Sequence, residues 1–137
     1  MIAMIGQIGQ IGQIGHDRPF MILCAIDDLI FSIKLSTAAK HLGVELFFER
    51  TAAGILPRVR EKQPRLVILD LNSRTLAPLE AIAALKADPE LRAVRTLGFV
   101  SHVDSDTIAA ARAAGVDQVL ARSAFVDRLP EILAPPA

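Results

Sequence analysis

The stretch from Leu66 to Asp70 constrains the fold more than any other part of the chain. Its sequence, LVILD, places four apolar residues, two of them β-branched, directly before a carboxylate. A run that is this short and apolar at every position is typical of a strand covered on both faces. Such a strand belongs in a parallel sheet with helices on both sides, where ligands bind beyond the carboxyl ends of the strands. Asp70 is therefore either a solvated residue that ends the strand or the centre of a site.

The rest of the chain alternates between strand-like and helix-like patterns. Short apolar runs predict strands over 22–26, 44–48, 66–69, 95–100 and 116–121. Apolar residues at helical spacing predict helices over 31–42, 51–62, 76–86, 105–114 and 126–133. Glycines 43 and 115 are expected to end two of these helices. Strict alternation of this kind predicts an α/β fold in which five helices cover a five-stranded parallel sheet.

The first twenty residues differ from the remainder. Gly6 to Gly15 repeats Gly-Gln-Ile at a period of three, and the segment lacks the basic start and continuous apolar centre of a signal peptide. We expect residues 1–20 to form a flexible N-terminal extension. Met21 opens the first strand pattern, and the remaining length suits one compact unit. Residues 21–137 are therefore predicted to be a single domain.

Composition excludes several classes of function. A formal net charge of zero argues against a nucleic-acid binder that relies on overall charge. The lone cysteine, Cys24, cannot form a disulfide within the chain, and it favours a reducing, cytoplasmic setting. No apolar run approaches the roughly 18–20 residues that would span a bilayer. Nucleic acid and membrane are therefore not the expected partners.

Polar residues follow four of the predicted strands, at what would be one edge of the sheet. They are Asp27-Asp28, Asp70, Ser101-His102 and Arg122-Ser123. A hydrolase triad is not expected among them, because adjacent residues on a strand point to opposite faces and Ser101 cannot easily share a hydrogen bond with His102. The set therefore indicates a cluster of carboxylates, a hydroxyl and a cation.

Four segments carry a resemblance to a known family. They read IDD at 26–28, VILDLN at 67–72, FVSH at 99–102 and GVDQVLARSAF at 115–125. In this order and spacing they resemble the receiver (CheY-like) domain of two-component response regulators, over nearly all of 21–133. The resemblance implies a flavodoxin-like, doubly wound parallel sheet of order 2-1-3-4-5 within three α/β/α layers.

The resemblance also implies roles for individual residues. Asp70 would accept a phosphoryl group, and Asp27, Asp28 and Asp70 would hold Mg²⁺. Ser101 would supply the hydroxyl that contacts the phosphoryl group, and Arg122 stands where the family has a lysine. Mg²⁺ prefers hard oxygen ligands, and a phosphoryl group in transfer needs positive charge around its oxygens. The implied role is that of a signalling protein and not of an enzyme.

Several positions depart from the family pattern. Arg122 replaces a compact ammonium with a planar fork, Ser123 replaces a proline, and Val119 replaces an aromatic residue. Residues 71–75 lack the turn that usually follows the acceptor aspartate. A gap-free match also leaves only Asp27 at one of the two acidic positions after the first strand. These departures describe an atypical receiver, or pseudo-receiver.

Two functions follow from this pattern. The first is a single-domain, response-regulator-like protein of a phosphorelay, phosphorylated at Asp70 with Mg²⁺ by a sensor histidine kinase or another signalling protein. The alternative is a phosphorylation-independent interaction module in which Arg122 pairs with Asp70 and locks one state. In both cases the partner surface, including that of a homodimer, is expected on the face formed by 105–114, 116–121 and 126–133.

Overall fold

The computed structural model describes residues 20–102 and 104–134, and within them a single parallel sheet. Its five strands lie in the order β3-β2-β4-β5-β6. Their bounds are β2 (Met21–Ala25), β3 (Glu45–Glu49), β4 (Leu66–Asp70), β5 (Arg95–Val100) and β6 (Gln118–Ala121). In chain order this is 2-1-3-4-5, so the predicted doubly wound topology is confirmed.

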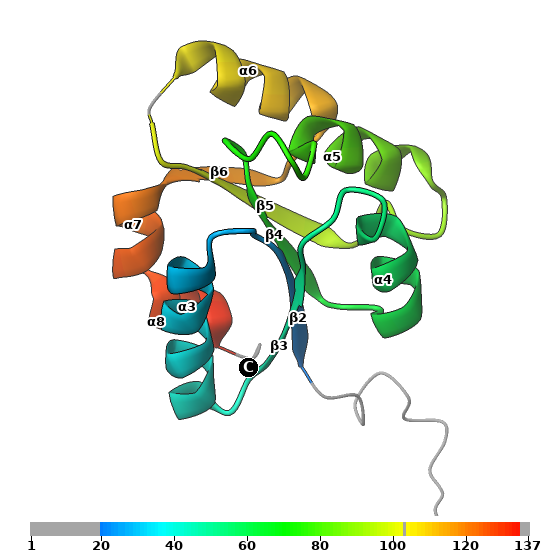
Figure 1. The fold of residues 1–137 in the computed structure, drawn as a ribbon. Coiled ribbons are helices and arrows are strands. Elements are labelled where there is room, and N and C mark those ends of the chain that lie inside the picture. Colours follow the sequence, from blue (N-terminus) through cyan, green and yellow to red (C-terminus); the bar gives the residue numbers. More distant parts are fainter. Residues whose placement is uncertain (1–19, 103, 135–137) are drawn as a thin grey trace, which may run out of the picture.

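Helices cover both faces of the sheet and make three layers (Figure 1). One face carries α4 (Ile55–Lys62), α5 (Pro78–Ala87) and α6 (Ser105–Ala114). The other carries α3 (Leu29–Leu42), α7 (Arg122–Asp127) and α8 (Leu129–Leu133). None of these described helices is long and apolar enough to cross a membrane.

Alternate residues of each strand enter two separate cores. Leu23 and Leu69 pack with α4 and α5, whereas Cys24 and Ile68 pack with α3 and α7. All four side chains are fully buried, as expected for central strands of a parallel sheet. Burial raises the pKa of the Cys24 thiol to about 12, so this thiol stays protonated and unreactive at neutral pH.

Three phenylalanine rings dominate the second core near the carboxyl edge of the sheet. Phe99 of β5 stacks on Phe125 of α7 with ring centroids 5.1 Å apart. Phe31 of α3 lies 5.3 Å from Phe99 and 6.0 Å from Phe125. The cluster therefore joins the first turn of α3 and the middle of α7 to the same strand, β5.

Polar caps fix where two helices begin, and glycines fix where they end. Asp28 caps α3 by accepting a 3.0 Å hydrogen bond from the backbone N–H of Phe31. Asp104 caps α6 in the same way. Gly43 and Gly115 follow the two helices with φ of 70° and 108°, a backbone conformation that glycine adopts without strain. Both predicted stops are confirmed.

The helix predicted over 51–62 begins later than Thr51. The Thr51 hydroxyl accepts a hydrogen bond from the N–H of Gly54 and caps a turn, after which α4 starts at Ile55. Pro57 then lies in the first turn of the helix, where its missing N–H costs nothing.

The single helix predicted over 126–133 is wrong. The chain forms α7 directly after β6, starting at Arg122, and then restarts as α8 at Leu129. Pro130 explains the break, because it has no N–H for an interior helical bond but fits the first turn of a new helix. The described sheet is thus flanked by six helices instead of five, and Arg122 opens a helix instead of lying in a loop.

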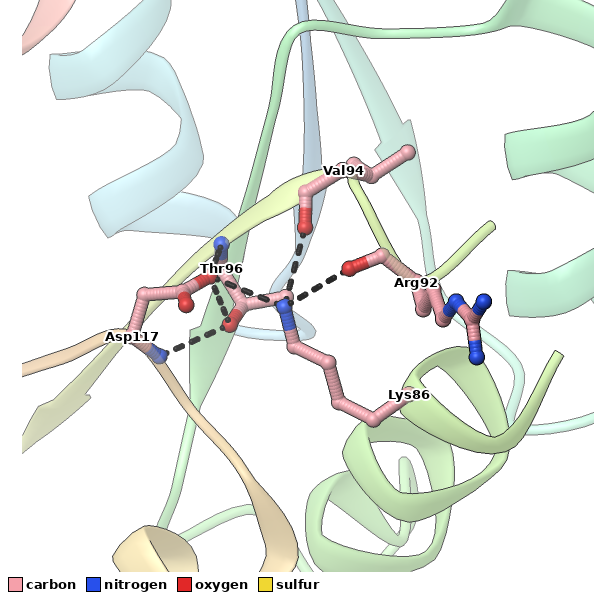
Figure 2. A network of polar contacts seen from close by, with 5 residues as sticks. All are labelled: Lys86, Arg92, Val94, Thr96 and Asp117. Carbon is pink, nitrogen blue, oxygen red and sulfur yellow. Dashed lines mark hydrogen bonds and ion pairs between the residues drawn. The ribbon is translucent and has the colours of Figure 1, made fainter. Parts of the chain in front are cut away.

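A polar network fastens the edge of the sheet opposite Asp70 (Figure 2). The Lys86 ammonium of α5 donates to the Asp117 carboxylate at 3.0 Å and to the carbonyls of Arg92 and Val94 at 3.2 Å each. The same Asp117 oxygen accepts from the backbone N–H and the hydroxyl of Thr96, at 2.8 and 3.0 Å. One carboxylate therefore ties α5 and β5 to the turn that precedes β6.

Replacing Asp117 by Asn is expected to lower the free energy of unfolding at pH 7 by about 1–2 kcal/mol, a modest value because the carboxylate is partly exposed. Burial acts to raise the pKa of Asp117, but the bonds from Lys86 and Thr96 outweigh it and lower that pKa. A lowered folded pKa stabilises the protein above the unfolded value of about 3.9, and the effect is lost as pH falls further. Urea unfolding at pH 7 and pH 3 should show the variant's deficit shrinking in acid.

The matched control for that experiment is Asp127→Asn. Asp127 is exposed and forms no ion pair with the described residues, so its replacement should change the unfolding free energy little at either pH. Equal stability of the wild type and the Asp117→Asn variant at pH 7 would contradict the role given to the network.

Candidate functional site

The carboxyl edge of the sheet gathers the polar residues that the sequence singled out. Asp27 and Asp28 follow β2, Asp70 ends β4, Ser101 follows β5, and Arg122 follows β6. Three of the five are brought into direct contact, because Arg122 reaches both Asp28 and Ser101. This edge is the candidate site.

The Arg122 guanidinium lies at the centre of these contacts. One terminal nitrogen is 3.5 Å from Asp28 Oδ2, and the other is 3.4 Å from the Ser101 hydroxyl. The guanidinium carbon sits 3.9 Å from the centroid of the Phe31 ring. A planar cation lies flat on an aromatic face in a way that a compact ammonium does not. Arg122 thereby links α7 to the start of α3, two helices that lie on the same side of the sheet (Figure 1).

The pairing of Arg122 with Asp70 that the sequence suggested differs from the arrangement observed. Among the described residues the ion pair of Arg122 is formed with Asp28. Phe31 supplies the reason, because it belongs to the helix that Asp28 caps. Because the guanidinium lies over the Phe31 ring, one of its terminal nitrogens comes close to the Asp28 carboxylate at the start of the same helix.

Both oxygens of Asp28 are engaged. Oδ1 accepts the N–H of Phe31, and Oδ2 faces Arg122. The bond from Phe31 is the main cause that lowers the pKa of Asp28, and the positive charge of Arg122 lowers it further against the opposing effect of burial. Asp28 is therefore an anion at neutral pH and already has a cationic neighbour.

Asp70 lies in a different electrostatic setting. Burial is the largest cause that raises its pKa, and the nearby charges of Asp27 and Asp28 add to the rise. A 3.0 Å hydrogen bond from the N–H of Asn72 and the charge of Arg122 act in the opposite direction. A half-buried carboxylate with a perturbed pKa at the end of a central strand is typical of a functional position.

Two residues of the loop after β4, Asn72 and Ser73, take part in the site although no role was predicted for them. Asn72 Oδ1 accepts the N–H groups of Ser101, at 2.6 Å, and His102, at 3.3 Å. The Ser73 hydroxyl donates to Asp27 Oδ2 at 3.0 Å. Asparagine and serine after a strand do signal side-chain bonds to nearby backbone, but the pattern does not reveal a distant partner. The loop is thus fastened to the ends of both β2 and β5.

Gly98 of β5 leaves room for the side chain of Leu71, the first residue of this loop. A Cβ atom at Gly98 would lie only 2.6 Å from the side chain of Leu71, the residue that follows Asp70. Leu71 is buried over the strand at that point. A side chain at position 98 would therefore push the Leu71 side chain out of its place over β5.

The Mg²⁺ ligands implied by the family resemblance were Asp27, Asp28 and Asp70. Their carboxylate oxygens are of the type that Mg²⁺ prefers. However, Asp28 Oδ2 is paired with Arg122, and Asp27 Oδ2 accepts the Ser73 hydroxyl. Across 20–102 and 104–134 no three His, Cys, Asp or Glu side chains lie close enough to hold a metal ion. This arrangement does not fit a divalent cation, and the positive charge at the edge comes from Arg122.

Comparison with known proteins gives matches through structure alone. No protein-family model matches the sequence. The search of curated proteins likewise found no match. Many solved structures of response regulators do match.

Three of these structures illustrate the similarity. The phosphorylated cyanobacterial phytochrome response regulator RcpA is 20% identical with a TM-score of 0.72, over 84% of this chain and 89% of that one. The Mn²⁺-bound form of response regulator Rcp1 is 22% identical with a TM-score of 0.69, over the same shares of the two chains. A response regulator from Hahella chejuensis is 19% identical with a TM-score of 0.75, over 82% and 91%.

Sequence identities of about 20% to these structures show a shared fold only. The chemistry at the Asp70 edge depends on the residues of this chain. The shared region covers most of both chains in each case. The strand order and the two helical layers agree with that similarity. The chain therefore has the flavodoxin-like receiver fold found in CheY-like response regulators.

Proposed function

We propose that this protein is a receiver-like signalling module that binds a partner protein and whose edge is held in one state by Arg122 without phosphorylation. The observation that carries the proposal is the set of contacts made by the Arg122 guanidinium. It lies on Phe31, beside Asp28 and within 3.4 Å of Ser101. The cation that a phosphoryl group on Asp70 would need is therefore already engaged.

Releasing Arg122 toward Asp70 would remove these contacts together. The stacked guanidinium would leave the Phe31 ring, a contact worth about 0.5–2 kcal/mol depending on its exposure. Asp28 would lose its partner, which costs little because both side chains are more than a third exposed. The combined loss favours the arrangement without a phosphoryl group.

Phosphoryl transfer to Asp70 in a phosphorelay is the second candidate function. One observation favours it: Asp70 Oδ2 accepts no hydrogen bond from the described residues, so it is available as a nucleophile. An Asp70 oxygen would form the new bond to phosphorus while the bond to the donor breaks and its electron pair leaves with the donor. A sensor histidine kinase or another phosphorylated signalling protein would be that donor.

Exposed apolar side chains support a role in binding a partner. Among the described residues, the large exposed ones all lie on α3, namely Leu29, Ile30, Ile33 and Leu42. The first three lie in its first two turns, directly after the capping residue Asp28. The face expected from the family, which the structure builds from α6, β6, the end of α7 and α8, has exposed alanines on α6 but no large exposed apolar side chain among the described residues. We therefore propose that a signalling partner binds at the start of α3, with the face of α6, β6, α7 and α8 as the alternative surface for a partner or a homodimer.

Incubation with acetyl phosphate and Mg²⁺, followed by intact mass spectrometry, separates the two candidates. We expect the mass of the wild type to stay unchanged, as for an Asp70→Asn control. A gain of one phosphoryl group in the wild type that is absent in the control would overturn the first proposal and establish the second.

A further inference from the structure

A large cavity opens at the edge of the sheet opposite Asp70, where β4, β5 and β6 begin. Its volume is about 1340 Å³, and it runs between the end of α4 and α8. Leu66 and Leu97 line it from the strands, and Val59 and Ile132 line it from the two helices. The volume exceeds the roughly 300–1,000 Å³ of most small-molecule sites, so an extended ligand with its water would fit.

Positive charge collects around this cavity. Its charged lining residues are Arg60, Arg65, Arg95, Arg128, Glu90 and Glu131. Four guanidinium groups against two carboxylates leave a surplus of two positive charges. The whole chain has 15 basic and 15 acidic residues, so this surplus is local. A cavity of this composition favours an anionic ligand.

The arginines that line the cavity differ in whether they already form ion pairs. Arg60 pairs with Asp88 and with Glu90, and Arg128 approaches Glu131 at 3.9 Å, beyond good hydrogen-bond range. Arg95 is exposed and forms no ion pair with the described residues. Arg95 and Arg128 can therefore each present a fork of donors to an anion, a geometry that matches phosphate oxygens.

An aromatic ring stands beside this charge. Phe20 lines the cavity, and its ring centroid lies 5.8 Å from the guanidinium carbon of Arg65. We propose that the cavity binds a nucleotide, with its phosphates on Arg95 and Arg128 and its base against Phe20 and Leu66. This site is separate from the Asp70 edge, and it does not depend on the function proposed for that edge.

The test is equilibrium titration of the full chain with a fluorescent N-methylanthraniloyl derivative of ATP, followed by displacement with ATP. Saturable binding is expected. Arg95→Gln and Arg128→Gln should each weaken it about tenfold, because each removes one charge-assisted contact with a phosphate. Arg74→Gln, an equal loss of charge on the loop after β4, should leave it within about twofold. Far-UV circular dichroism verifies that each variant is folded.

Any of the following results would overturn the proposal. The first is no saturable binding at millimolar ATP, and equal binding by the wild type and both cavity variants would count equally against it. The second is displacement by tripolyphosphate as effective as by ATP, which would show that only a polyanion is held. The third is stronger displacement by an acidic peptide such as oligoglutamate, which would make the cavity a peptide groove.

Discussion

Replacing Phe99 by Ala is expected to lower the free energy of unfolding by about 3–5 kcal/mol, the range for deleting a buried phenyl ring. The Phe99 side chain is fully buried, stacks on Phe125 at 5.1 Å and lies 5.3 Å from Phe31. Its removal leaves a cavity between α3, β5 and α7 that close-packed neighbours fill only in part. Urea unfolding followed by circular dichroism measures the loss.

The matched control is Phe47→Ala on β3. Phe47 is only partly buried and carries the Lys62 ammonium 4.6 Å from its ring centroid, so a smaller loss of about 1–2 kcal/mol is expected. If the two variants lost equal stability, the phenylalanine cluster would not be the centre of the second core.

Replacing Arg122 by Lys is expected to produce the largest change in the behaviour of the site. A lysine ammonium cannot lie flat on Phe31 and contact Asp28 and Ser101 with separate nitrogens, as the guanidinium does. The Asp28 carboxylate would then be open to another cation. We expect the variant to bind Mg²⁺ with beryllofluoride at least about tenfold more tightly than the wild type, a difference of about 1.4 kcal/mol.

The measurement for this variant is the change in the amide chemical shift of Ser101 during titration with Mg²⁺ and beryllofluoride. Arg74→Lys is the control, because Arg74 is exposed on the loop after β4 and forms no ion pair with the described residues. Stability should fall by at most about 2 kcal/mol in Arg122→Lys, because the contact with Phe31 is lost while the partly exposed ion pair contributes little, and it should change little in Arg74→Lys. If Arg122→Lys responded no better than the control, the altered loop over 71–75 would be what limits the site.

Local patterns were sufficient to predict most of the fold. Short apolar runs located the strands, and Gly43 and Gly115 marked helix ends because their backbone conformation is local. The final helix was not predicted correctly because a proline can either end a helix or stand in the first turn of a new one, and the sequence alone does not show which applies to Pro130. It ends one helix and fits the first turn of the next.

The site was predictable only where it follows from topology. The carboxyl ends of parallel strands meet at one edge, which places Asp28, Asp70, Ser101 and Arg122 together. The ring beneath Arg122 could not be predicted, because Phe31 fits the apolar pattern of a core helix. Arg122 pairs with Asp28 instead of Asp70 because of that ring. This pairing therefore could not be predicted from the sequence either.

Titration of the ¹⁵N-labelled wild type with millimolar Mg²⁺ and then beryllofluoride tests most directly whether Arg122 holds this edge without phosphorylation. The expected result is that the amide resonances of Asp70 and Ser101 stay in place, because Arg122 remains on Phe31 beside Asp28. Saturable shifts of both resonances in the wild type would contradict that role and show that a metal and a phosphoryl analogue displace the guanidinium.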